Sequence, residues 1–441
     1  MKKQLLLLFI FIVSTVMYSQ NWSAVGPGLN KAAGALFADT SSGFLYAGGI
    51  FDSAGTLPLN HIGYWDGSQW NAMGQGLNGV VAAINSYGGD IFAVGDFSAS
   101  DTTAVYNIAR WNGSNWLSVG GGLNAVGLAL FNLNGSLFVS GNFTLAGGQP
   151  CKYIAEWDGV NWQSVDTNIV STNPYETIMS MGSFENNLVI GGNFIAGGTA
   201  NNIAILNSGT WQPLSTGTNS MVTSIRDLNT ELVVTGFFSQ AGSTSAICVA
   251  KWNGTSWIPF PAPTSSYVSS NTIVNGQLVF GGNVNSFMNG SVSSTCIASF
   301  DQSSLTWSGI TTGIDNMVSA LATMGNTLYA AGAFDTAGAS PIKNIAKIDA
   351  STLGLKYIPT ENTIEVFPNP FTGKLFIRTN FNDNTKLKIR IVDVLGREIS
   401  PVIKFNSEGI EMDRGNLPNG IYFMQVWKNG LFISEIKLVA M

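Results

Sequence analysis

The chain has 441 residues, of which 20 are lysine or arginine and 26 are aspartate or glutamate, giving a net charge of −6 at neutral pH. Charged residues make up 10% of the chain, well under the ~25% that is usual for soluble domains, while aromatic residues make up 11%. The aromatic content excludes an intrinsically disordered chain. The acidic balance argues against nucleic acid as a partner, because phosphate binding needs basic residues.

Residues 1–19 have the layout of a secretory signal peptide: two lysines, an apolar run from Leu5 to Met17, and the small residue Ser19. A membrane anchor is the alternative interpretation, but this run is shorter than the ~20 residues that a spanning helix needs. We therefore expect cleavage, and no integral membrane segment after it.

Residues 20–352 contain a repeat of 46 to 50 residues that occurs seven times. Each repeat has four short stretches rich in Val, Ile, Phe and Trp, separated by Gly and Asn, and this pattern favours four antiparallel strands. Four strands in a repeat of this length are typical of a propeller blade, so the sequence predicts an all-β, seven-bladed β-propeller. The tryptophans that mark the repeat are Trp22, Trp70, Trp116, Trp162, Trp211, Trp257 and Trp307.

Tight turns between the third and fourth strands predict aromatic pairs within the repeats. In the stretch from Trp65 to Trp70, a two-residue loop of Gly67 and Ser68 places the two indoles opposite each other. We expect these tryptophans to serve packing. The same spacing predicts Trp111 opposite Trp116, Trp157 opposite Trp162, Trp252 opposite Trp257, Leu206 opposite Trp211 and Phe300 opposite Trp307. Acidic residues after the third strand are expected to form turns, and they are Asp66, Asp158, Asp301 and Asp349.

The last repeat lacks a fourth strand, and the start of the chain offers one. The sequence of Asn21 to Val25 resembles the fourth-strand segment of the other repeats. We expect this segment to complete the last blade, which would leave no open edge. Leu355 to Ile358 are a competing candidate for the same place.

The text Gly-Gly-x-Phe, Ala-Gly-Gly and Asn-Ile-Ala-x-Trp resembles propeller repeats of bacterial surface proteins and, more distantly, of fungal cortical polarity markers. The resemblance covers about residues 21 to 352 and implies a fold. It implies little about function, because propellers host both binding and catalysis.

Three features of the repeats suggest chemistry that the repeat itself argues against. Gly74 to Gly79 fit the pattern G-x-G-x-x-G, but strands flank them where a dinucleotide site needs a helix. His61, the only histidine, shares its repeat position with Asn107 and Cys248, among others, so we expect a structural role. The three cysteines have neither disulfide nor zinc spacing, and we predict no metal and no cofactor.

The composition changes near residue 360. Residues 361–441 hold 19 charged residues in 81, whereas residues 21–360 hold 25 in 340. We predict a linker at 353–361 and a separate domain at 362–441, whose seven short strands suggest a small immunoglobulin-like β-sandwich.

Four motifs in this last domain carry a second resemblance. They are Phe367-Pro-Asn-Pro370, Asp393-Val-Leu-Gly-Arg397, Leu417-Pro-Asn-Gly-Ile-Tyr422 and a final strand ending Lys437-Leu-Val. Together they resemble the C-terminal sorting domain of type IX secretion cargo in the Bacteroidota. The resemblance implies passage through the periplasm, translocation across the outer membrane by the type IX machinery acting on residues 362–441, and then release or surface attachment. It assigns the sorting signal to Pro368, Asn369, Pro370, Asp393, Gly396, Arg397, Gly420, Ile421 and Tyr422.

The function of the propeller depends on the side chains near its axis. Hydrolytic propellers need converging carboxylates where the inner strands begin, and the sequence offers only Glu176 there, with Lys31, Tyr175 and Tyr267 at similar positions. A single Glu does not make an acid and base pair. We therefore predict a non-catalytic binding or adhesion protein for a glycan or protein ligand, not an enzyme, with these four residues and the loops between second and third strands as its ligand face. The alternative is a polysaccharide-active enzyme with an axial site near Glu176.

Overall fold

The computed structural model falls into two compact units, Met1–Leu355 and Lys356–Met441, called here the propeller unit and the tail unit. The signal peptide, the linker and the competing strand at Leu355 to Ile358 lie outside the described residues. No helix in the described part of the chain is both long and apolar enough to cross a membrane. The described residues are 21–165, 168–171, 178–260, 267–284, 294–302, 304–352, 364–379, 387–393, 398–399, 402–406, 409–415, 417–428 and 431–440.

The described part of the propeller unit contains seven antiparallel sheets, numbered here in chain order, each of four or five strands. Sheet 1 consists of β2 (Ala33–Asp39), β3 (Phe44–Gly49), β6 (Ile62–Trp65) and β7 (Trp70–Ala72), and sheet 2 of β8 (Val80–Tyr87), β9 (Asp90–Asp96), β12 (Ile108–Trp111) and β13 (Trp116–Ser118). Sheet 3 consists of β14 (Gly127–Leu133), β15 (Ser136–Gly141), β18 (Ile154–Trp157) and β19 (Trp162–Ser164). Sheet 4 consists of β20 (Ile169–Ser171), β21 (Ile178–Phe184), β22 (Asn187–Ala196), β23 (Ala200–Asn207) and β24 (Thr210–Pro213).

Sheet 5 consists of β25 (Val222–Asp227), β26 (Leu232–Gly236), β29 (Val249–Trp252) and β30 (Trp257–Pro259). Sheet 6 consists of β31 (Tyr267–Val274), β32 (Gln277–Asn283), β33 (Ile297–Asp301) and β34 (Thr306–Gly309). Sheet 7 consists of β35 (Val318–Met324), β36 (Thr327–Gly332), β39 (Ile345–Asp349) and β1 (Ser23–Ala24). Two-residue strands form small hairpins in the loops between second and third strands, and these are β4 (Ser53–Ala54) with β5 (Leu57–Pro58), β10 (Ala99–Ser100) with β11 (Thr103–Ala104), β16 (Leu145–Ala146) with β17 (Gln149–Pro150), β27 (Gln240–Ala241) with β28 (Thr244–Ser245) and β37 (Thr336–Ala337) with β38 (Ser340–Pro341). A short 3-10 helix, η2 (Ala350–Thr352), follows β39.

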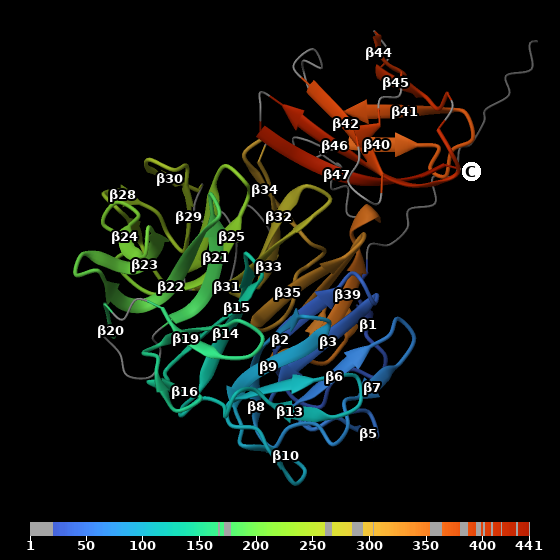
Figure 1. Cartoon of the computed structure of the whole chain (residues 1–441). Helices are drawn as coiled ribbons and strands as arrows, with labels where there is room; N and C mark the ends of the chain where they lie inside the picture. The colour runs from blue at the N-terminus through green and yellow to red at the C-terminus, as the bar shows by residue number, and fades with distance from the viewer. Residues whose placement is uncertain are drawn as a thin grey trace, which may run out of the picture. The chain divides into compact units, whose positions relative to one another are not determined.

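The inner strands of the seven sheets make a closed ring. Each contacts the inner strand of the next sheet, from β2 through β8, β14, β21, β25 and β31 to β35, and β35 contacts β2 again. This is the β-propeller arrangement that the repeat predicted, and Figure 1 shows the sheets following one another around the ring from blue to orange.

Cross-strand pairing places the repeated tryptophans where the turns predicted. Trp65 lies opposite Trp70, and the other five predicted pairs are also in register. Gly67 has a φ of 97°, a value that favours glycine in this tight turn. The Trp70 indole N–H donates to the Val25 carbonyl at 2.9 Å in the preceding connection, and Trp116 bonds Met73 in the same way at 2.8 Å. These indoles therefore join neighbouring sheets, which is the packing role expected.

The repeat position of His61 has a left-handed backbone in all seven sheets. Its N–H donates to the carbonyl that follows the second strand, as from His61 to Phe51 at 2.8 Å. The position is thus set by backbone geometry, and His61 has the structural role that the repeat predicted. The φ angles lie between 60° and 73° at His61, Asn107, Tyr153, Asn202, Cys248, Cys296 and Asn344.

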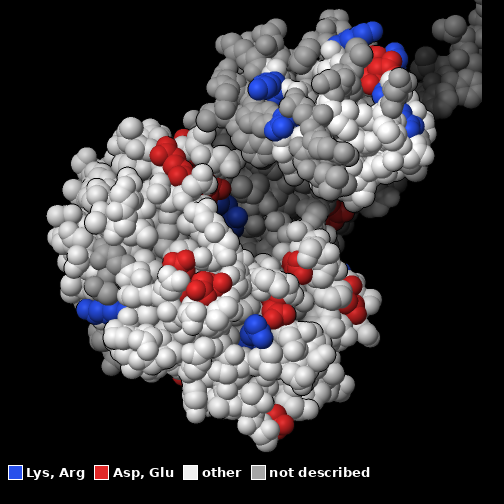
Figure 2. All heavy atoms as spheres, in the orientation of Figure 1, with Lys and Arg blue, Asp and Glu red and all other residues white. Residues whose placement is uncertain are grey.

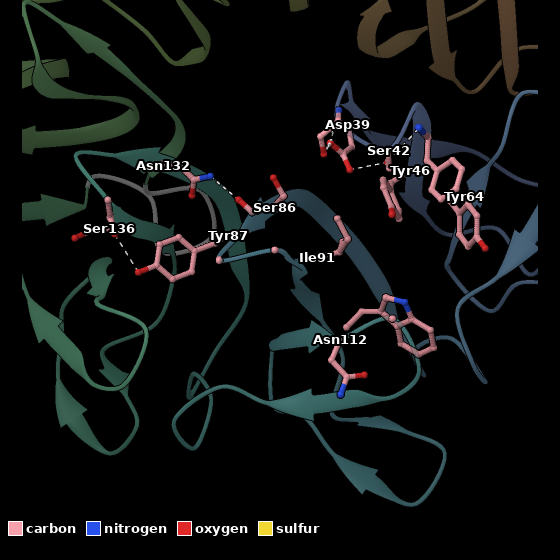
Figure 3. A pocket seen from close by; sticks show the side chains of 17 residues that line it. Asp39, Ser42, Tyr46, Tyr64, Ser86, Tyr87, Ile91, Asn112, Asn132 and Ser136 are labelled. Atoms are coloured by element: carbon pink, nitrogen blue, oxygen red, sulfur yellow. Dashed lines mark hydrogen bonds between the residues drawn. The ribbon is translucent and has the colours of Figure 1, made fainter. Parts of the chain in front are cut away.

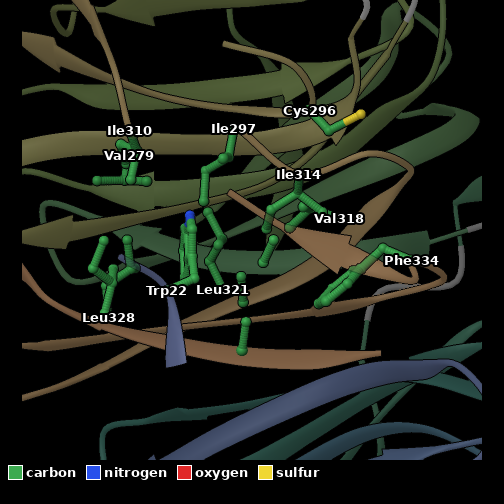
Figure 4. Packing of buried hydrophobic residues seen from close by; sticks show 14 of the residues in the cluster. Trp22, Val279, Cys296, Ile297, Ile310, Ile314, Val318, Leu321, Leu328 and Phe334 are labelled. Carbon is green, nitrogen blue, oxygen red and sulfur yellow. The ribbon is translucent and has the colours of Figure 1, made fainter. Parts of the chain in front are cut away.

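The first strand of the chain closes the ring. Ser23 pairs with Lys347 and Ala24 with Ala346, so β1 is the outer strand of sheet 7, as predicted. Trp22 is 2% exposed and packs among buried side chains of sheets 6 and 7 that include Ile310 and Leu328; Figure 4 shows its indole in the middle of this cluster.

The tail unit has two four-stranded sheets. Buried side chains from both sheets, among them Ile377, Met412, Met424 and Leu438, form one shared core. The sheets consist of β40 (Ile364–Phe367), β41 (Lys374–Thr379), β45 (Gly409–Asp413) and β44 (Val402–Asn406), and of β43 (Glu398–Ile399), β42 (Leu387–Asp393), β46 (Gly420–Lys428) and β47 (Leu431–Ala440).

Candidate functional site

The Pro-Asn-Pro motif of the tail unit is attached to the last strand. The Asn369 side-chain oxygen accepts a hydrogen bond from the Val439 N–H at 2.8 Å, and the Phe371 N–H donates to the Val439 carbonyl at 2.9 Å. Both Pro368 and Pro370 follow cis peptide bonds. This motif and the C-terminal strand, about 70 residues apart, therefore form one structural feature.

The motif that ends in Tyr422 is held from two sides. Tyr422 is 5% exposed, and its hydroxyl donates to the Pro418 carbonyl at 3.0 Å. Arg414, which no sequence motif singled out, donates from Nη2 to the Asn419 side chain at 2.5 Å and from Nη1 to the Thr372 carbonyl at 3.2 Å. Arg414 thus connects the Tyr422 motif to the turn that follows Pro370.

The remaining predicted sorting residues divide between described and undescribed positions. Asp393, at the end of β42, lies opposite Tyr422 of β46 in the cross-strand register. Gly420 and Ile421 begin β46, where the Ile421 side chain is 40% exposed. Gly396 and Arg397 lie outside the described residues.

The four residues predicted for the ligand face are only partly described. Lys31 pairs with Asp52 at 2.7 Å, and its hydrogen bond lowers the pKa of the Asp52 carboxyl. Tyr267 stacks on Phe237, with ring centroids 4.0 Å apart and an interplanar angle of 18°. Lys31 lies just before β2 of sheet 1, and Tyr267 begins β31 of sheet 6. These two sheets are not neighbours in the ring. Tyr175 and Glu176 lie outside the described residues.

Asparagines of the repeat brace this same end of the propeller. In each Gly-Leu-Asn connection the side-chain oxygen accepts two backbone N–H groups from the loop after the second strand. Asn78, for example, accepts from Ser98 at 2.9 Å and Ala99 at 3.0 Å. Many of the polar residues that made this end attractive for binding therefore hold its loops in place. Asn30, Asn124 and Asn219 make the same pair of bonds.

An open cleft lies at the opposite end of the sheets, where the first and second strands are joined. It measures about 970 Å³ and is lined by the first hairpins of sheets 1, 2 and 3, by Tyr64 of β6 and by the turn after β12, from Trp111 to Gly113. We call it the hairpin cleft. Figure 3 shows Tyr46 and Tyr64 on one side, Tyr87 and Ser136 on the other, and Ile91 between them.

One wall of the hairpin cleft is an aromatic platform, defined here as Phe44 and Tyr64. Their rings stack with centroids 4.9 Å apart and an interplanar angle of 28°. Tyr46 lies directly opposite Tyr64 on the neighbouring strand, at 5.6 Å between centroids. Both platform residues pack on the buried core between sheets 1 and 2 while staying partly exposed. Trp111 is also partly exposed at the cleft, whereas its counterparts in the repeat, Trp65, Trp157 and Trp252, are buried.

Hydroxyl and amide groups make up the polar part of the cleft. The Tyr87 hydroxyl donates to the Gly135 carbonyl at 3.0 Å, and the Asn132 amide donates to the Ser86 carbonyl at 2.5 Å. Asp39 is the only charged side chain of the lining. Its two oxygens accept from the Ser41 and Ser42 hydroxyls, each at 2.6 Å.

The pKa shifts in the cleft keep Asp39 ionised and Tyr46 protonated. Burial acts to raise the pKa of Asp39, but the hydrogen bonds from Ser41 and Ser42 outweigh it, so the pKa of this carboxyl is lowered. Burial, helped by the Asp39 charge, raises the pKa of the Tyr46 phenol. Among the described residues, no group of three or more His, Cys, Asp or Glu side chains could hold a metal ion. Figure 2 shows the propeller face in view as mostly uncharged, with scattered acidic and basic side chains.

Comparison with known proteins gives one family match. Residues 365–440 match the model of the secretion system C-terminal sorting domain. This confirms the sorting-domain prediction for the tail unit, and it marks the protein as type IX cargo that is exported to the cell surface or secreted. The full-length chain has no match among the curated proteins.

Three solved structures are similar to the chain at low identity. The WD40 beta propeller domain of Doa1 is 11% identical, with 76% of this chain and 99% of that chain covered and a TM-score of 0.48. The Niastella koreensis GH74 enzyme is 12% identical, with 96% of this chain and 75% of that chain covered and a TM-score of 0.47. The computationally designed Ika8 protein is 16% identical, with 75% of this chain and 100% of that chain covered and a TM-score of 0.46. Likeness at this level carries no function to this chain.

Proposed function

We propose that this protein is a non-catalytic binding module that passes through the periplasm and holds a glycan or protein ligand outside the cell. The sorting domain supports the delivery. The observation that carries the binding role is the hairpin cleft, which combines aromatic rings with uncharged polar side chains. Its volume of 970 Å³ is at the upper end of the roughly 300–1,000 Å³ of ligand sites.

Binding is tested with the purified full chain on a glycan array and on a panel of purified surface proteins. We expect saturable binding to at least one member of either panel. No saturable binding to either panel would overturn the proposal and favour a passive structural layer.

Catalysis is tested on every glycan that binds. We expect no cleavage products by chromatography after long incubation. Cleavage that the substitution Glu176→Gln abolishes would overturn the non-catalytic role and favour an axial hydrolase.

A further inference from the structure

We propose that the hairpin cleft binds a neutral saccharide, with a sugar ring against the aromatic platform of Phe44 and Tyr64. This inference rests on the proposed function and names the site and the ligand class. The cleft lies at the opposite end of the sheets from the ligand face that the sequence suggested, so it is a separate site.

The first support is a comparison of the seven sheets with one another. Tyr64 precedes the paired tryptophan of the third strand, and Phe44 lies next to it on the second strand. In sheet 2 these two positions hold Arg110 and Asp90, which form an ion pair at 3.2 Å. The hairpin fold thus accepts a polar pair here, and sheet 1 has a partly exposed aromatic pair instead.

Two further sheets place polar pairs at these positions. Sheet 3 has Glu156, which accepts a hydrogen bond from Ser136 at 2.6 Å. Sheet 5 has an ion pair between Lys251 and Glu231. Polar pairs satisfy the fold in three sheets, so the repeat does not require an aromatic pair in sheet 1, and the part of Phe44 and Tyr64 that is not packed on the core is available for ligand contact.

The second support is the chemistry of the lining. Aromatic faces are electron-rich and attract the polarised C–H groups of a sugar ring. The hydroxyls of Ser41, Ser42 and Tyr87 each donate a hydrogen bond within the protein. The Ser42 oxygen also accepts from the Phe44 N–H at 3.3 Å, so it is the Ser41 and Tyr87 oxygens that keep the acceptor lone pairs suited to the many O–H donors of a saccharide.

The third support is charge. Asp39 is ionised and no basic side chain belongs to the lining. A uronic acid or a phosphorylated sugar would be repelled by this carboxylate, whereas a neutral sugar would not. The ligand that fits best is therefore an uncharged oligosaccharide.

The test measures binding by isothermal titration calorimetry with the full chain. The probes are cellohexaose, laminarihexaose, mannohexaose and xylohexaose, with hexagalacturonate as the acidic comparison. The main variant is the double substitution Phe44→Asp with Tyr64→Arg, which copies the pair of sheet 2 and so is designed to fold. The matched control is Tyr106→Ala, because Tyr106 is an exposed aromatic residue, 51% accessible, that does not line the cleft.

We expect the wild-type chain to bind a neutral probe, the double variant to bind it at least about tenfold more weakly, and the control to bind it unchanged. Thermal melting checks that the variant is folded. If it is not, Tyr64→Ile takes its place, since Ile205 occupies this position in sheet 4.

Two outcomes would overturn the inference while leaving the proposed function standing. One is undiminished neutral-sugar binding by the folded variant. The other is a wild-type chain that binds hexagalacturonate or a protein but no neutral probe. A chain that binds nothing at all would overturn both.

Discussion

Asparagine at the repeat position of His61 does more than tolerate a left-handed backbone. Its side-chain N–H reaches a carbonyl in the connection to the next sheet, which adds a hydrogen bond between neighbouring sheets. His61 has no such bond, and its Nδ1 is buried without a partner. The observed asparagine bonds are Asn107 to Leu123 at 3.0 Å, Asn202 to Thr218 at 2.7 Å and Asn344 to Leu29 at 2.8 Å.

We predict that His61→Asn stabilises the propeller by about 1 kcal/mol, the usual net value of one hydrogen bond. The new amide would donate to Leu77, the counterpart of Leu123, and the unpaired nitrogen would be removed. Urea denaturation measures the change. The reverse substitution, Asn107→His, should lower the free energy of unfolding by a similar amount; a neutral result for both would contradict this account.

The turn residue Asp66 performs a task that asparagine performs in other sheets. Its Oδ1 accepts the N–H groups of Ser68 and Gln69, each at 2.8 Å. Asn112 accepts the equivalent pair in sheet 2. The hydrogen bond from the Ser68 hydroxyl, followed by those from the two backbone groups, lowers the pKa of Asp66 well below the ordinary value of 3.8 for this carboxyl.

We predict that Asp66→Asn leaves stability near neutral pH almost unchanged but reduces its loss in acid. A carboxyl with a lowered folded pKa contributes stability above its unfolded pKa, and that contribution is lost as pH falls through about 3.8 toward the folded value. Denaturation midpoints between about pH 6 and pH 2 measure this. Identical pH profiles for variant and wild type would count against it.

At the scale of elements, the ring depends on a strand of only two residues. β1 provides the outer edge of sheet 7, but its backbone ladder is short. Side-chain packing therefore adds to its attachment. Trp22 fills the core between sheets 6 and 7, and Val25 is buried in the core between sheets 7 and 1.

We predict that Trp22→Ala destabilises the propeller by about 3–5 kcal/mol, the usual cost of removing a large buried aromatic side chain. Thermal and urea unfolding measure it. The control is Val160→Ala at a side chain that is 74% exposed, where the change should stay within about 0.5 kcal/mol. A small effect at Trp22 would mean that the ring is held closed by other contacts.

At the scale of the whole molecule, the tail unit is the sorting domain that serves export, and binding is the role that we propose for the propeller unit. Hydrogen bonds tie the sorting motifs to the C-terminal strand and to Arg414, so motifs that are far apart in the sequence belong to one folded domain.

We predict that deletion of residues 362–441 leaves the protein in the periplasm. The type IX machinery would then lack its recognition domain while the signal peptide still directs the first step. Cell fractionation and surface proteolysis follow the product, with the full chain as the control. Normal surface delivery of the truncated chain would show that the signal lies elsewhere.

The sequence by itself determined the features that repeat or act locally. The 46 to 50 residue period, the turn glycines and the tryptophan spacing predicted the propeller and its cross-strand pairs, because each depends on residues close together in the chain. The sorting motifs were recognisable for the same reason. Sequence reasoning also predicted strands around Gly74 to Gly79, and β8 does follow them where a dinucleotide site would need a helix.

Only the tertiary structure decided where a ligand could bind. The hairpin cleft combines residues from three sheets, and the stack of Phe44 on Tyr64 depends on cross-strand register and ring orientation. Arg414 donates hydrogen bonds to the Thr372 carbonyl and the Asn419 side chain, and no sequence motif pointed to these contacts. Ring closure by β1 was one of two candidates until Trp22 was seen in the core of sheets 6 and 7. A periodic sequence specifies each sheet, but the gaps between sheets depend on how they pack, so the site had to be found in three dimensions.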